Sequence, residues 1–141
     1  GASLNLGGTT QTLAQVSGSG TVSNGGLIVT GTIAPGGTNN IGTLTVAAST
    51  VASGTLLVDA DASGGDRLAV EGDLDMSALS LVLANPEQLS RNKYYDIVTC
   101  TGTRTGTFVS NNLPSEHWRI LYRENGSVRI VYSAGTLIRL R

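Results

Sequence analysis

The sequence has few of the residues that mark several common protein classes. Its single cysteine, Cys100, excludes an intrachain disulfide and a cysteine-based zinc site. No apolar run reaches about 18 residues, so we expect no transmembrane helix. Only 13% of the 141 residues are charged and the formal net charge is −1, which argues against a general nucleic-acid binder. Hydrophobic residues still make up 40% of the chain, which is enough for a core.

Charge is absent from the first part of the chain and then changes sign along it. Residues 1–58 contain no Asp, Glu, Lys, Arg or His. From Arg91 onward, eight basic residues face three acidic ones. Between these parts, six of the ten carboxylates fall within 17 residues, and we call this group the acidic belt: Asp59, Asp61, Asp66, Glu71, Asp73 and Asp75. The sequence therefore predicts a neutral end, an acidic middle and a basic end.

Apolar residues alternate with a period of two, which indicates strands rather than helices. Leu-x-Val pairs begin at Leu27, Leu44, Leu56 and Leu68, with Gly or Asn residues between them. Short strands with glycine-rich corners fit a β-solenoid, in which each coil stacks on the next. They also fit an antiparallel β-sandwich or barrel. The polar residues within the repeat and its lack of charge favour the first architecture, an all-β chain built as a short parallel β-helix.

The last third of the chain predicts antiparallel strands that close this solenoid. Asn125-Gly126 lies between two alternating runs, 118–123 and 127–132, and this is the strongest short-range signal for a β-hairpin. A final strand is expected over residues 136–140. Closure of this kind covers an open sheet edge, which would otherwise recruit other strands.

We expect one domain with two regions. Residues 1–100 form a β-solenoid-like repeat region, and residues 101–141 form an antiparallel hairpin or cap region of the same domain. A strand is predicted over 94–100, and the one helical turn is expected near 86–90.

Several motifs of the chain, taken in order, resemble a known family. They are GTIAPG at 31–36, IGTLTV at 41–46, GDRLAVEG at 65–72 and TGTF at 105–108. Together they are similar to the C-terminal portion of autotransporter-type passenger proteins, which carry the autotransporter-associated β-strand repeat. The resemblance covers roughly residues 15–132. It implies a parallel β-helix in a secreted or cell-surface bacterial protein, and we expect either a piece of a longer protein or a small stand-alone relative.

The acidic belt supplies the candidate catalytic residues, Asp59, Asp61 and Asp66. If two of these carboxyls meet, the pKa of one rises and the pair can share a proton. An aspartic-type peptidase uses such a pair, and a wider pair hydrolyses glycosides. The Asp-Thr-Gly and Asp-Ser-Gly motifs of aspartic peptidases are absent, and the alternative interpretation is that these are solvated carboxylates at glycine-rich corners.

The same three aspartates, Asp59, Asp61 and Asp66, are candidate ligands for Ca²⁺, together with nearby backbone carbonyls. No other cofactor is expected. The one histidine, His117, and Cys100 could in principle form a nucleophile and base, but no local signature supports that pair.

The basic end of the chain interleaves arginines with aromatic residues. This pattern predicts stacking and charge contacts with an acidic partner such as a sulfated or sialylated glycan. The alternative interpretation is the solvated face of a hairpin. The candidate binding residues are Trp118, Arg119, Tyr122, Arg123, Arg129 and Tyr132.

Three functions follow from these patterns. The first is a structural or adhesion module of a secreted or cell-surface bacterial protein that faces the host. The second is an acid-pair peptidase that acts on extracellular glycoproteins such as mucin, and the third is a Ca²⁺-stabilised β-module. The expected partners are a host glycoprotein or glycan, the rest of a larger surface protein, and further copies of the chain.

Overall fold

A computed structural model describes residues 3–37 and 40–133, and these residues form an all-β chain, as the sequence predicts. The described part has no α-helix and one 3-10 turn, η1 (Pro86–Gln88), at the expected position. The strands are β1 (Ser3–Gly18), β2 (Thr21–Pro35), β3 (Thr43–Ala52), β4 (Thr55–Val58), β5 (Ala60–Asp61), β6 (Gly64–Gly65), β7 (Arg67–Val70), β8 (Leu74–Asp75), β9 (Ser80–Leu83), β10 (Tyr95–Cys100), β11 (Arg104–Thr105), β12 (Trp118–Tyr122) and β13 (Val128–Tyr132).

Most of the strands pair in parallel. The series β1–β2–β3–β7–β10 is parallel at every step, and so are β2–β4–β9 and β3–β8–β11. Paired residues of the middle strands recur 23 to 25 positions apart, as in Leu44 with Leu68. The separation is 16 to 18 positions between β1 and β2, and 30 positions for β7–β10 and β8–β11. Because parallel neighbours cannot be joined by a tight hairpin, the chain must travel away and return between them.

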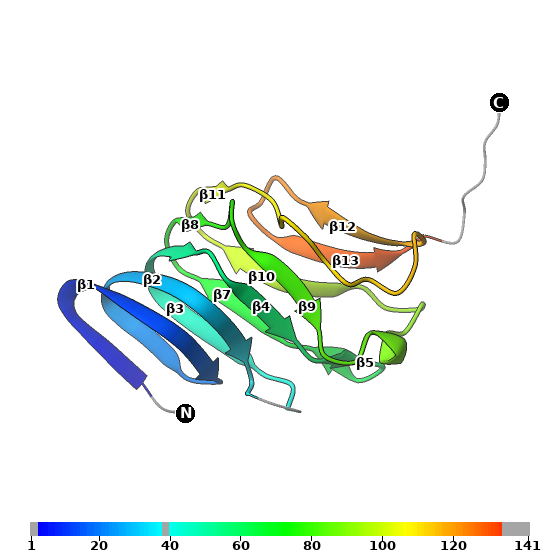
Figure 1. The fold of residues 1–141 in the computed structure, drawn as a ribbon, viewed down its shortest axis with the longest axis horizontal. Coiled ribbons are helices and arrows are strands. Elements are labelled where there is room, and N and C mark those ends of the chain that lie inside the picture. The colour runs from blue at the N-terminus through cyan, green and yellow to red at the C-terminus, as the bar shows by residue number, and fades with distance from the viewer. Residues whose placement is uncertain (1–2, 38–39, 134–141) are drawn as a thin grey trace.

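The main sheet is curled and open. Its central path runs β12-β13-β10-β7-β3-β2-β4-β9, and β1, β8 and β11 add to the path at its sides. Figure 1 shows β1 at one end of the molecule and the β12–β13 hairpin at the other. This half-barrel shape fits the barrel alternative, although antiparallel pairing within this sheet is confined, in the described residues, to β10–β13 and β12–β13.

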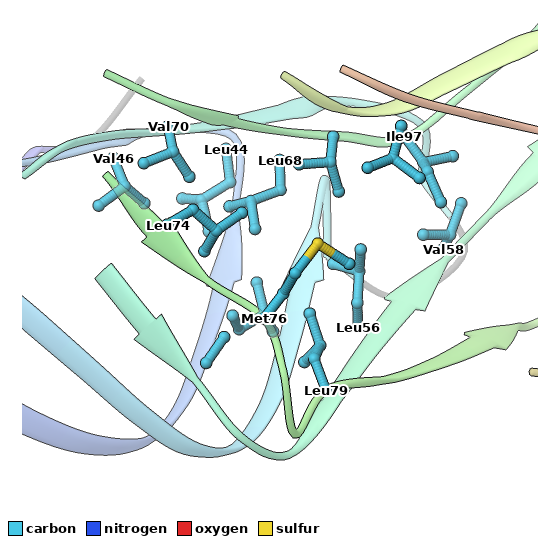
Figure 2. Packing of buried hydrophobic residues seen from close by; sticks show 14 of the residues in the cluster. Leu44, Val46, Leu56, Val58, Leu68, Val70, Leu74, Met76, Leu79 and Ile97 are labelled. Atoms are coloured by element: carbon cyan, nitrogen blue, oxygen red, sulfur yellow. The ribbon is translucent and has the colours of Figure 1, made fainter. Parts of the chain in front are cut away.

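The core consists of the inward side chains of these ladders. All four predicted Leu-x-Val pairs are buried, because alternate residues of a strand face the same side. Leu44, Leu68 and Val98 lie on neighbouring strands at paired positions. Figure 2 shows side chains from β3, β4, β7 and β10 converging on one interior, with Met76 and Leu79 beside them. Each such leucine contributes roughly 1.5–3 kcal/mol of apolar burial.

The predicted C-terminal hairpin is present. Strands β12 and β13 pair antiparallel, with Trp118 opposite Tyr132 and Ile120 opposite Ile130. At the turn, the Asn125 Oδ1 atom accepts hydrogen bonds from the backbone N–H and the hydroxyl of Ser127. Gly126 has a φ of 88°, a conformation in which a β-carbon is disfavoured. The strand predicted over 136–140 lies outside the described residues.

Membrane-spanning helices were sought in the same residues. Within residues 3–37 and 40–133, no helix is long and apolar enough to cross a membrane.

Candidate functional site

The structure separates the acidic belt into carboxylates with different partners. Asp61 and Asp75 each accept two hydrogen bonds from a serine two positions on, Ser63 and Ser77 respectively. These bonds lower the pKa of both carboxyls, the serine hydroxyl having the largest effect. Asp73 accepts a hydrogen bond from the backbone N–H of Thr103 at 2.8 Å. These three aspartates therefore serve as partners of nearby backbone, at or close to the surface.

Asp59 and Asp66, in contrast, are buried together. Asp59 is 7% exposed and Asp66 is fully buried. The small antiparallel pair β5–β6 folds the chain back on itself between them, with Ala60 opposite Gly65. The backbone N–H of Asp66 donates to the Asp59 carbonyl at 2.8 Å, and the N–H of Asp59 donates to the Asp66 Oδ2 atom at 2.8 Å.

The Asp66 carboxyl also joins two segments far apart in the sequence. Its Oδ1 atom accepts a hydrogen bond from the backbone N–H of Gly42 at 2.8 Å, just before β3, while its Oδ2 atom holds Asp59 just after β4. The pKa of Asp66 is raised to about 6, mainly by burial, while the two N–H donors lower it and the charge and side-chain hydrogen bonding of Asp59 add to the rise. Asp66 thus holds a proton well above the pH at which a solvated aspartate loses it.

The Asp59 side chain supplies an acceptor for that proton. Its Oδ1 atom is buried and has no hydrogen-bond partner among the described residues. A neutral Asp66 carboxyl can donate to such an atom, and a shared proton is the arrangement that two adjacent carboxyls favour. The sequence predicted an acid pair among Asp59, Asp61 and Asp66. Two of these residues meet, while the Asp61 carboxylate bonds to Ser63 instead.

The aspartate pair has limited access to solvent. Asp59 and Asp61 border a polar pocket of about 250 Å³, but Asp66 does not. The other residues that line this pocket are Asn40, Ile41, Ala60, Asn85 and Gln88. A molecule in the pocket would therefore meet Asp59 first, with Asp66 behind it as a buried proton donor.

Two of the three predicted calcium ligands, Asp59 and Asp66, lie together, while the Asp61 carboxylate bonds to Ser63. Across residues 3–37 and 40–133, no group of three or more His, Cys, Asp or Glu side chains is arranged to hold a metal ion. Calcium binding by Asp59, Asp61 and Asp66 stays a prediction, and it would depend on backbone carbonyls for most of its ligands.

The six predicted binding residues of the basic end also separate. Arg129 forms a bidentate pair with Asp96 at 2.8 and 3.1 Å, and its guanidinium lies 3.8 Å from the centre of the Tyr94 ring. Tyr122 accepts a hydrogen bond from the backbone N–H of Phe108 at 3.0 Å. These side chains are committed to contacts within the protein. Arg119 and Arg123 are exposed on the hairpin.

Trp118 and Tyr132, in contrast, line a common pocket of about 370 Å³, which we call the aromatic pocket. Three segments form it: η1 with the loop that follows, the loop before β12, and the paired strands β12 and β13. Its lining residues are Pro86, Glu87, Leu89, Arg91, Pro114, Ser115, His117, Trp118 and Tyr132. Sequence reasoning missed Arg91 and Glu87 as part of this site, because their loop is more than 20 residues away from Trp118 along the chain.

The Tyr132 ring is the centre of the aromatic pocket. The Trp118 ring meets it edge-on at 5.2 Å, and the His117 ring lies tilted at 5.7 Å. The Arg91 guanidinium is 5.1 Å from its centroid, within the range of a cation–π contact. Cys100 does not pair with His117, since its thiol donates to the Gly72 carbonyl at 3.1 Å.

A larger groove crosses the parallel strands on another part of the surface. Its volume is about 550 Å³, and Thr, Ser and Asp side chains contribute much of its wall. Its lining residues are Thr10, Gly26, Leu27, Ile28, Ser49, Thr50, Val51, Asp73, Leu74, Asp75, Thr103 and Thr105. Many occupy paired positions on neighbouring strands, as Ile28, Val51, Asp75 and Thr105 do, so the groove follows the stacking direction.

Comparison of the chain with protein-family models, with curated proteins and with solved structures finds no match. The resemblance to autotransporter passenger proteins therefore stays a prediction from its motifs.

Proposed function

We propose that this chain is a structural or adhesion module of a secreted or cell-surface bacterial protein that faces the host. In this proposal the parallel ladders are the coils of a short β-helix, which the antiparallel hairpin β12–β13 closes at one end. The observation that carries the proposal is the recurrent separation of paired residues. Thr43 pairs with Arg67 and Thr50 with Leu74, each 24 positions on, and Thr55 pairs with Ser80, 25 positions on.

A coil that repeats every 24 or so residues gives a rigid stack in which each layer contacts its neighbours. Such a stack keeps surface side chains at fixed spacing, which suits binding to an extended polymer. The outer groove supports this function, because its walls carry hydroxyl and carboxylate groups along several strands. The uncharged first 58 residues add a surface that water wets through Thr, Ser, Asn and Gln.

Retention on mucin tests this proposal. Beads coated with the full chain should be held on a mucin-coated surface at physiological salt, and beads coated with albumin should wash off. The mucin should keep its original size distribution during the experiment. Loss of the coated beads at the rate of the albumin control would contradict an adhesive role.

An acid-pair hydrolase is the second candidate, because Asp59 and Asp66 lie together beside a polar pocket. In that case the same mucin incubation, run from pH 3 to 8, should release fragments. Asp59→Asn and Asp66→Asn should each abolish the release, while Glu71→Gln, at an exposed member of the acidic belt outside the outer groove, should leave it unchanged. Mucin that stays intact with the folded wild-type protein at every pH would rule out this candidate.

A further inference from the structure

We propose that the aromatic pocket binds an acidic saccharide, with Tyr132 and Trp118 contacting the sugar ring and Arg91 and His117 contacting its anionic group. The inference rests on the proposed adhesive function and gives it a site and a ligand class. Its physical basis is a pocket of about 370 Å³, a size typical of small-ligand sites, that contains two aromatic rings and several polar side chains.

The walls of the pocket are held in place by hydrogen bonds behind them. The Tyr95 hydroxyl donates to the Asp61 carbonyl at 2.7 Å and accepts from the backbone N–H of Ser90 at 2.9 Å, which fixes the loop that carries Arg91. On the opposite wall, the backbone N–H of Ser133 donates to the His117 carbonyl at 2.8 Å. A site built from fixed walls loses little freedom when a ligand binds.

Several polar groups in this pocket make no hydrogen bond within the described part of the protein, although Arg91 and His117 both contact the Tyr132 ring. Among the described residues, the Arg91 guanidinium, the His117 imidazole and the Trp118 indole N–H have no hydrogen-bond partner, and the one ion pair is Arg129–Asp96. Trp118 is only 8% exposed as a whole, and its indole N–H can donate a hydrogen bond to a ligand in the pocket. Three donors at one pocket favour a ligand rich in oxygen acceptors.

The charges of the pocket select the kind of saccharide. Arg91 is always cationic, and a guanidinium binds carboxylate or sulfate groups through directed hydrogen bonds. Glu87 is the one carboxylate in the lining and can accept hydrogen bonds from sugar hydroxyls. The apolar C–H face of a pyranose ring stacks well on an aromatic plane. A saccharide that combines hydroxyls, a ring and an anionic group meets all of these requirements.

Trp118 is the only tryptophan of the chain and lines the pocket, so its fluorescence reports on occupancy. We would titrate the full chain at pH 7 with 3′-sialyllactose, with a sulfated lactose and with neutral lactose. A saturable change is expected with at least one acidic sugar. The affinity for lactose should be lower by about tenfold or more, since lactose lacks the charge-assisted contact. The two acidic probes distinguish a carboxylate from a sulfate as the preferred group.

Arg91→Gln should weaken binding of the preferred acidic sugar about tenfold, to the level of lactose. Arg67→Gln is the matched control, because Arg67 is exposed on β7 and lies outside the aromatic pocket. The affinity of the Arg67→Gln variant for the acidic sugar should stay within about twofold of wild type, as expected for a distant surface charge. Absence of a saturable response to both acidic sugars, or an equal loss in the two variants, would overturn the proposal.

The mucin experiment separates this proposal from the function on which it rests. Retention of coated beads together with no binding of either acidic sugar overturns the pocket assignment and leaves the adhesive module in place. Binding of an acidic sugar that Arg91→Gln abolishes, with no retention on mucin, supports the pocket and contradicts adhesion to mucin.

Discussion

At the scale of single residues, the most unusual chemistry of this chain is the buried pair Asp59 and Asp66. Burial alone would make a charged carboxyl costly, and two backbone N–H donors offset only part of that cost. A proton on Asp66 removes one negative charge from the buried pair. The pair therefore links the segment before β3 to the corner after β4 best when it carries a proton.

This account predicts that the protein becomes more stable as the pH falls towards 4.5. The pKa of Asp66 is raised to about 6 in the folded chain, from 3.8, mainly by burial. The folded state therefore keeps a proton that the unfolded state has released between about pH 4 and 6, and the free energy of unfolding falls as pH rises through this window. Between pH 4.5 and 7.5, the titration of Asp66 lowers the free energy of unfolding by about 2 kcal/mol.

Urea denaturation at pH 4.5 and 7.5 measures this effect when wild type is compared with Asp66→Asn. The variant lacks the titrating group. Its free energy of unfolding should therefore fall by about 2 kcal/mol less than that of wild type between pH 4.5 and 7.5. Asp73→Asn, at an exposed carboxylate, serves as the control and should follow wild type. Equal pH dependence of wild type and Asp66→Asn would show that the buried pair does not hold this proton.

At the scale of the strands, stability depends on inward residues that stack from one strand to the next. Leu68 of β7 is fully buried and pairs with Leu44 on one side and Val98 on the other. Its neighbour Arg67 lies on the same strand but is exposed. The period-two pattern of the sequence predicted this alternation of a buried and an exposed side chain.

Leu68→Ala should lower the free energy of unfolding by about 3 kcal/mol, since the cavity lies between two packed strands that cannot close it easily. Urea denaturation at constant pH measures the loss. Arg67→Ala should change stability by no more than about 0.5 kcal/mol. Similar losses for the two variants would mean that β7 does not present Leu68 to the core.

Local patterns in the sequence predicted which segments are strands and which side chains face inward. The Leu-x-Val pairs and the Asn125-Gly126 hairpin have this local origin. Local sequence patterns do not show which distant segments pair with each other. The meeting of Asp59 with Asp66 depends on the short β5–β6 reversal, whereas the Asp61 carboxylate bonds to Ser63. Likewise, Arg91 reaches Tyr132 only through the tertiary fold.

At the scale of the whole molecule, the strands of the curled sheet stack mainly in parallel, and paired residues of its middle strands lie 23 to 25 positions apart. The aromatic pocket lies beside the β12–β13 hairpin, which Figure 1 shows at the opposite end of the molecule from β1. The outer groove runs across the parallel strands. Both surfaces owe their shape to this stacking, so its register is the property on which the functional proposals depend.

A disulfide between paired positions tests that register directly. Thr45 of β3 and Ala69 of β7 are Cα partners, and both are partly exposed. In a Cys100→Ser background, Thr45→Cys with Ala69→Cys should form a disulfide under mild oxidation, because adjacent strands lie about 4.8 Å apart. Thr45→Cys with Glu71→Cys, two positions further along, should remain reduced, since its Cα atoms are roughly 8 Å apart.

Mass spectrometry of the oxidised and digested variants decides between the outcomes. The account predicts a linked peptide pair for positions 45 and 69 in nearly all molecules and only a trace for positions 45 and 71. Equal linkage in the two variants, or linkage in neither while both remain folded, would contradict the parallel stacking of coils.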